Sequence, residues 1–217
     1  MQRYLDGEAD TVAAGELFGR AMRSGAVVYL DGQLGAGKTT LFKMFLGLYR
    51  PTSGHVLLNG MEVSYWLEKG LAPHFGYLPQ NIQPVYGTIA ENISRFSDCE
   101  PEALYKVASL CGVHELIMQL PNAYETIIGP GMTPFSQGQT QLLGLARAIF
   151  SQPYMVVLDE PNSALDQHGE QILLQVIRQL KQQGTTVVIV PPSGDMACYI
   201  ESLKRLSDYP ANYLAPG

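Results

Sequence analysis

Residues 26–39 read AVVYLDGQLGAGKT, and they decide the fold that we predict. The first five are a continuous apolar run, which is typical of a strand buried on both faces of a parallel sheet. The stretch from Gly32 to Thr39 fits the pattern G-x-x-x-x-G-K-[ST], and a helical segment is expected from Thr40 onward. A strand, a glycine-rich loop and a helix in this order are the context in which such a loop binds phosphate groups.

The chemistry of this loop follows from its backbone and from two side chains. Its glycines let the chain curl so that successive N–H groups point at phosphate oxygens, and the following helix adds a partial positive charge. Lys38 would reach the β and γ phosphates of a nucleotide, and the Thr39 hydroxyl would hold Mg²⁺. The alternative, a glycine-rich turn with a solvated lysine, is disfavoured by the flanking strand and helix. The expected nucleotide contacts are Gly32, Gly35, Ala36, Gly37, Lys38, Thr39 and Thr40.

Two further apolar runs, at residues 155–158 and 187–190, predict strands that form the centre of the sheet together with the run at 26–30. Helical patterns precede each of them, and Asp166 is a plausible N-cap for the second helix. This alternation predicts an α/β fold in which a mainly parallel sheet is flanked by helices. The apolar positions at helical spacing are Leu142, Leu145, Ala146 and Ile149, then Leu173, Val176, Ile177 and Leu180.

The 217 residues are expected to form a single nucleotide-binding domain. Segment 85–145 contains three helical patterns, at 88–96, 101–110 and 113–119, and is predicted to be a helical subdomain. Segment 191–217 is expected to be an irregular tail or to hold one short helix.

Charge and composition exclude several classes of function. Fourteen Lys and Arg residues against 20 Asp and Glu give a net charge of −6, which disfavours direct binding of nucleic acid. The three cysteines form no CxxC pair, so neither a disulfide framework nor a zinc knuckle is supported. No apolar run approaches the roughly 20 residues that span a bilayer, and no signal peptide is recognised. We therefore expect a cytoplasmic protein that would reach a membrane only through a partner.

Two carboxylates close the apolar run 155–158. Asp159 could polarise a water on Mg²⁺, and Glu160 is placed to accept a proton from an attacking water. Strand ends are where α/β sheets place their chemistry. Two such acids taken alone are more often a helix cap or a surface turn, and it is the phosphate loop that favours the catalytic interpretation.

Three more stretches follow in an order and spacing that resemble the nucleotide-binding domain of ABC transporters. They read YLPQ at 77–80, FSQGQ at 135–139 and SALD at 163–166. The likeness runs from about residue 46 to 190. Within it, the stretches GTIAENI at 87–93, GPG at 129–131 and DEPNS at 159–163 resemble exporters of the type I protein-secretion kind.

This resemblance implies roles for individual residues. Gln80 would match the Q-loop, which senses Mg²⁺ and the membrane partner, and Asp166 would match the D-loop. Ser136 and Gly138 would match the signature that caps the γ-phosphate held by a second chain; the alternative is that 135–139 is only a capped helix start.

An ATP- and Mg²⁺-binding ATPase domain is the function that this resemblance implies. The domain would form a head-to-tail homodimer on binding ATP and would work with a transmembrane partner. Glu160, as the catalytic base, would act together with Lys38 and Gln80, and the metal ligands would be Thr39, Gln80 and Asp159.

Several departures from the family pattern lower the expected activity. Gln137 replaces the first glycine of the signature, and Thr140 stands where a basic residue usually follows. Pro192 lies where the switch histidine is expected; because that imidazole would orient the attacking water, we predict slow or absent hydrolysis. Pro130 stands where exporters often carry Glu in their contact loop, which puts coupling to a membrane domain in doubt.

The first 45 residues resemble a different family, the TsaE-type ATPases that help make threonylcarbamoyladenosine in tRNA. The likeness lies in ADTVAAGEL at 9–17 and VYLDGQLGAGKTT at 28–40, although PTSG at 51–54 again matches the ABC pattern. A change of family within one helix suggests a chimeric or engineered protein, or else a divergent natural one. Two alternatives therefore stand: a scaffold that binds nucleotide without turnover, and an ATPase of tRNA threonylcarbamoyladenosine synthesis. Tyr4 is a candidate for stacking on adenine.

Overall fold

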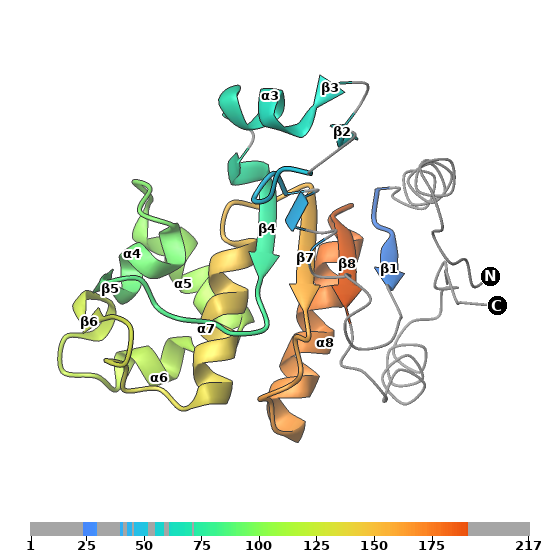
Figure 1. Cartoon of the computed structure of the whole chain (residues 1–217). Helices are drawn as coiled ribbons and strands as arrows, with labels where there is room; N and C mark the ends of the chain where they lie inside the picture. The colour runs from blue at the N-terminus through green and yellow to red at the C-terminus, as the bar shows by residue number, and fades with distance from the viewer. Residues whose placement is uncertain are drawn as a thin grey trace.

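Figure 1 shows the chain as a computed structural model, which describes residues 24–29, 40, 43–44, 46–51, 55–58, 61–70 and 72–190. The segment of the predicted phosphate loop, 32–39, lies outside the described residues. So do Tyr4, the rest of 1–23, and the tail 191–217 with Pro192 and the helix expected there.

A four-stranded parallel sheet forms the centre of the described structure (Figure 1). Its strands lie in the order β1 (Val27–Tyr29), β8 (Thr186–Val190), β7 (Met155–Asp159) and β4 (Phe75–Leu78). The register pairs Leu78 with Leu158, and Asp159 with Val190. All three predicted apolar runs form strands, but only β8 and β7 lie inside the described sheet, whereas β1, which we also expected at its centre, lies at its edge. β4 was not predicted, because FGYL is short and interrupted by glycine.

The sheet is buried on both faces, as its continuous apolar strands require. On one face, alternate residues of the central strands pack with Leu46, and on the other they pack into the larger core with the helices. Val157, Val188 and Val190 belong to the first cluster; Val156, Leu158, Val187 and Ile189 belong to the second. The predicted α/β arrangement of a parallel sheet flanked by helices is therefore confirmed.

Two long helices, α7 (Gln137–Ile149) and α8 (Gln167–Gln182), pack against this sheet; α8 buries one stripe of its surface, whereas α7 is buried along most of its length. The two helices follow the apolar spacing read from the sequence. Both begin at a side-chain cap: Ser136 accepts a hydrogen bond from the Gln139 N–H, and Asp166 accepts one from the Gly169 N–H. Asp166 is thus the N-cap that the sequence predicts.

Smaller helices lie together beyond β4 (Figure 1). They are α4 (Ile89–Ser94), α5 (Pro101–Leu110), α6 (His114–Met118) and the 3₁₀ turn η2 (Ala123–Glu125). The three predicted helices of this segment are confirmed. The antiparallel pair of β5 (Gly87–Thr88) and β6 (Ile127–Ile128) was not predicted. α7 packs against β4 as well as against α4 and α5, so it joins these helices to the sheet.

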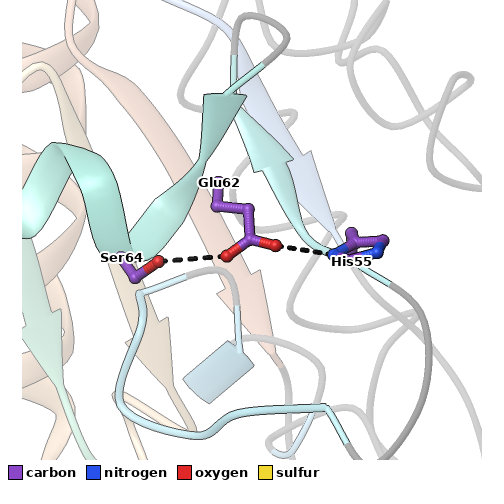
Figure 2. A network of polar contacts seen from close by, with 3 residues as sticks. All are labelled: His55, Glu62 and Ser64. Atoms are coloured by element: carbon purple, nitrogen blue, oxygen red, sulfur yellow. Dashed lines mark hydrogen bonds and ion pairs between the residues drawn. The ribbon is translucent and has the colours of Figure 1, made fainter.

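A second short antiparallel pair, β2 (Leu57–Leu58) and β3 (Met61–Glu62), leads into α3 (Val63–Glu68) and the 3₁₀ turn η1 (Ala72–His74). Figure 2 shows the polar contacts of Glu62, the last residue of β3. His55 Nδ1 lies 2.6 Å from Glu62 Oε1, and Ser64 Oγ donates a hydrogen bond to Glu62 Oε2 at 3.3 Å. The hydrogen bond with His55 lowers the pKa of Glu62. Because His55 and Glu62 are exposed, this network contributes little to the fold.

Among the described residues, no helix is long and apolar enough to cross a membrane.

Candidate functional site

The carboxyl ends of β4 and β7 lie side by side, because these parallel strands are neighbours in register. Gln80 follows β4, and Asp159 and Glu160 come at the end of β7. Gln80 Nε2 donates a hydrogen bond to Glu160 Oε2 at 2.7 Å. The structure therefore brings together two of the predicted site residues that lie 80 positions apart in the sequence.

Asp159 precedes Glu160 as the last residue of β7 and is almost fully buried, with 3% of its surface exposed. It is hydrogen-bonded to Tyr77 of β4. Burial, with a smaller contribution from the charge of Asp159, raises the pKa of Tyr77 to about 12. Tyr77 thus stays protonated and can donate to the carboxylate, which compensates part of the cost of burying it.

Glu160 has an unusual backbone, and its polar groups are held from several directions. Its φ is +49°, in the left-handed region that non-glycine residues seldom adopt. Its N–H donates to the Val190 carbonyl at 2.8 Å, and its own carbonyl accepts from the Ser163 N–H at 3.2 Å. The same carbonyl also accepts from Gln141 Nε2 at 3.1 Å. The conformation of this residue is therefore set by strand β8, helix α7 and the turn that follows.

Gln141 is a residue of this site that our sequence reasoning missed. It lies on α7 with 3% of its surface exposed, and its Oε1 accepts the Ala164 N–H at 3.1 Å. One turn earlier on α7, a Cβ at Gly138 would lie 2.7 Å from the Ala164 carbonyl oxygen. The first turns of α7 thus pack directly on the 163–166 turn. The available signal was a polar residue adjoining the apolar stripe of a predicted helix.

Ser136 caps the exposed start of α7. Its Oγ accepts from the Gln139 N–H at 3.2 Å, and its own N–H donates to Gln139 Oε1 at 3.0 Å. This reciprocal pair is a capping box, which satisfies two of the free N–H groups at the helix start. The expected roles of Ser136 and Gly138 toward a second chain remain predictions, since both interpretations of 135–139 include a capped helix.

The predicted phosphate contacts from Gly32 to Thr39, Lys38 among them, lie outside the described residues. Thr40 is described as an exposed helical residue. β1, which precedes the loop, is parallel to β8 and pairs Tyr29 with Ile189. It therefore ends at the same edge of the sheet as Asp159, which is paired with Val190.

The oxygen atoms at this edge suit a magnesium ion. Mg²⁺ prefers carboxylate, carbonyl and hydroxyl oxygens. Asp159 supplies a buried carboxylate, and the Gln80 amide still has its oxygen while its nitrogen binds Glu160. Among the described residues, no group of three or more His, Cys, Asp or Glu side chains could hold a metal by itself.

Comparison with known proteins shows which family this chain is similar to. The family described as ABC transporter matches residues 20–163. The type I secretion system ATP-binding protein PrsD of Rhizobium meliloti (strain 1021) is 42% identical over 170 residues, which are 78% of this chain and 29% of that protein. The ATP-dependent lipid A-core flippase of Chromohalobacter salexigens is 34% identical over 188 residues, 86% of this chain and 32% of that protein.

A solved structure shows the same arrangement of elements. The structure of a bacterial Atm1-family ABC exporter with ATP bound matches with a TM-score of 0.69 and 27% identity, covering 80% of this chain and 31% of that chain. The matched part of this chain thus spans about a third of the length of these three relatives.

The family match also corrects a boundary. It begins at residue 20 and so includes the whole stretch 28–40 that we compared with TsaE-type ATPases, but not the stretch 9–17. The ABC likeness therefore extends further toward the N-terminus than residue 46. None of the comparisons supports a TsaE-like segment or a chimeric or engineered origin.

Proposed function

Because this chain belongs to the ABC transporter family, as an ATP-binding domain with the α/β P-loop fold, we propose that it binds ATP with Mg²⁺ and hydrolyses it slowly to drive transport. The transport itself would need a membrane-spanning partner, either a separate chain or another part of a longer protein. The domain would associate with the membrane through that partner and would otherwise face the cytoplasm.

One observation carries this proposal: the hydrogen bond from Gln80 to Glu160 beside the buried carboxylate of Asp159. Glu160 would accept a proton from the water whose oxygen attacks the γ-phosphorus. As the new P–O bond forms, the bond between the γ-phosphorus and the β–γ bridging oxygen breaks, and ADP leaves with that oxygen. Gln80 orients the Glu160 carboxylate for this transfer by donating to one of its oxygens.

The remaining site residues would bind the nucleotide and its metal. Backbone N–H groups of 32–37 and the Lys38 ammonium would contact the β and γ phosphates. Mg²⁺ would neutralise the charge that develops on the phosphate oxygens, and Thr39, Gln80 and Asp159 would hold it.

A second chain would complete each site. Ser136 and Gly138 lie at the start of α7, where free N–H groups can bind an anion, so we include them as contacts to the γ-phosphate held by the other chain. Segment 85–145 would be the helical subdomain that carries this signature. The two sites of a head-to-tail dimer would thus each combine the phosphate loop of one chain with the signature of the other.

The test is phosphate release from Mg²⁺-ATP by the whole chain, followed over hours. Glu160→Gln should lower the rate by at least about a hundredfold, because it removes a general base. ATP affinity, measured by calorimetry, should stay within about twofold, since the carboxylate would act on water rather than on binding.

Two further variants complete the experiment. Lys38→Ala should abolish ATP binding, whereas Gln175→Ala on the exposed side of α8 should change neither quantity. Unchanged ATP affinity in Lys38→Ala would reject the proposed site.

A second candidate function is a P-loop scaffold that binds nucleotide without turnover. Pro191-Pro192-Ser193 follows β8 where the family's switch histidine is expected, and this favours it. Wild-type phosphate release no faster than in Glu160→Gln, with ATP binding intact, would support the scaffold. No comparison supports the tRNA-modification alternative, and we do not propose it.

A further inference from the structure

Glu160 needs external support to keep its conformation. A φ of +49° is unfavourable for a residue other than glycine, and such a conformation persists only where its neighbours hold it in place. If the backbone relaxed to an extended conformation, the carboxylate would leave Gln80. Whatever anchors the Glu160 carbonyl therefore also anchors its carboxylate.

The Gln141 side chain is such an anchor, and it uses both ends of its amide. The nitrogen donates to the Glu160 carbonyl at 3.1 Å, and the oxygen accepts the Ala164 N–H at 3.1 Å. The side chain is buried, so water cannot replace either bond without a rearrangement. One amide thus spans the turn from Glu160 to Ala164 and fixes its shape.

The same residue connects this turn to the start of α7. Gln141 lies five positions after Ser136, on the helix that Ser136 caps. Gly138, which lies between these two residues in the sequence, packs closely against the Ala164 carbonyl. A helix transmits a shift of its first turn as a rigid body. A displacement at Ser136 would therefore reach the Glu160 backbone through Gln141.

We infer that Gln141 is a positioning residue, which holds Glu160 in its left-handed conformation and ties its carboxylate to the start of α7. The catalytic part of this inference rests on the proposed function. The structural part does not depend on it, because it concerns hydrogen bonds within one chain.

Two variants of the whole chain separate the two ends of the amide. Gln141→Met has a similar volume and removes both hydrogen bonds. In its ionised form, Gln141→Glu keeps an acceptor for the Ala164 N–H but has no donor for the Glu160 carbonyl. The matched control is Gln175→Ala, which replaces an exposed glutamine on α8.

Hydrolysis is the first measurement. Both Gln141 variants should lower kcat by about tenfold to a hundredfold, since a shift of about 1 Å in a catalytic group can cost that much. KM for ATP should stay within about twofold, because the nucleotide contacts lie elsewhere. A purely structural role would instead change KM and the thermal midpoint together, and wild-type kcat in both folded variants would overturn the inference.

Hydrogen exchange, followed by NMR, is the second measurement, and it needs no turnover. The Ala164 N–H should exchange faster in Gln141→Met than in the wild type and should stay protected in Gln141→Glu. Unchanged protection in a folded Gln141→Met would overturn the inference even if ATP is hydrolysed.

The wild type keeps the inference testable if the variants do not fold. Its Gln141 side-chain amide protons and its Ala164 N–H should both exchange slowly, and rapid exchange of both would overturn the inference. If the wild type releases no phosphate, the proposed hydrolysis fails, and these exchange rates still decide whether Gln141 holds the turn.

Discussion

At the scale of single residues, the buried polar groups around Asn92 are satisfied one by one. Asn92 is 1% exposed; its Nδ2 donates to the carbonyls of Val85 and Thr88, and its Oδ1 accepts from the Val85 N–H. Arg147 Nη2 donates to the same Oδ1 at 2.6 Å, while its Nη1 reaches the Gln83 carbonyl at 3.4 Å. The side chains of Asn92 and Arg147 therefore hold the segment between Gln80 and α4 against α7.

Replacing Asn92 by Ala should destabilise the chain by about 1–3 kcal/mol, because several buried partners lose their hydrogen bonds at once. Urea unfolding measured by circular dichroism would give this difference. Asn122→Ala is the control, since Asn122 is exposed and makes no side-chain cap bond. Equal stability of Asn92→Ala and the wild type would show that water or a rearranged Arg147 replaces these bonds.

The residue scale also shows what a sequence can reveal about the site. Asp159 and Glu160 could be predicted because they end an apolar run, and Gln80 because its stretch resembles a family motif. The role of Gln141 could not be predicted, because its partners Glu160 and Ala164 are brought to it only by the packing of α7. The same limit applies to the left-handed backbone of Glu160, which no local pattern indicates.

At the scale of elements, the approach of α7 to β4 depends on a residue without a side chain. A Cβ at Gly76 would lie 2.2 Å from the carbonyl oxygen of Ala148, which is backbone and cannot rotate away. The close approach places the end of β4, and therefore Gln80, beside the helix that carries Gln141. Gly76 interrupts the apolar run FGYL, and for this reason β4 was not predicted. The same glycine allows β4 to pack closely against α7.

Gly76→Ala should therefore destabilise the chain by about 1–3 kcal/mol, as overpacking of a core does. Thermal unfolding of the variant and the wild type would measure this loss of stability. In contrast, Gly169→Ala should change stability less, because its new methyl group would meet only the Leu165 side chain and the Asp166 carboxylate at 3.1–3.3 Å. A larger loss in Gly169→Ala than in Gly76→Ala would contradict this account of the α7–β4 contact.

Elements of different length were predictable to different degrees. β7, β8, α7 and α8 are long enough for their apolar pattern to repeat, and the sequence indicates each of them. The pairs β2–β3 and β5–β6 have two residues per strand, which is too short for any period. The pair β5–β6 also joins segments that lie far apart in the sequence, so no local pattern indicates it.

At the scale of the whole molecule, the residues that the proposed function assigns to the two halves of a shared site lie at different places in one chain. Gln80 and Glu160 meet at the sheet edge, whereas Ser136 begins α7 at an exposed position. Under the proposed function, ATP would join two chains by contacting the phosphate loop of one and the α7 start of the other. Hydrolysis would then separate them, so a chain that binds ATP without cleaving it should stay paired.

Glu160→Gln should accordingly form a dimer in saturating Mg²⁺-ATP, with twice the monomer mass by light scattering, and return to a monomer in ADP. Adding Ser136→Arg should abolish this dimer, because a bulky side chain at the cap would block the approach of the second nucleotide. Its ATP affinity measured at low protein concentration should remain that of the single variant, since its own phosphate loop is untouched. A Glu160→Gln chain that stays monomeric while calorimetry shows full ATP occupancy would contradict the shared site, and it would leave Gln80 and Glu160 acting within one chain.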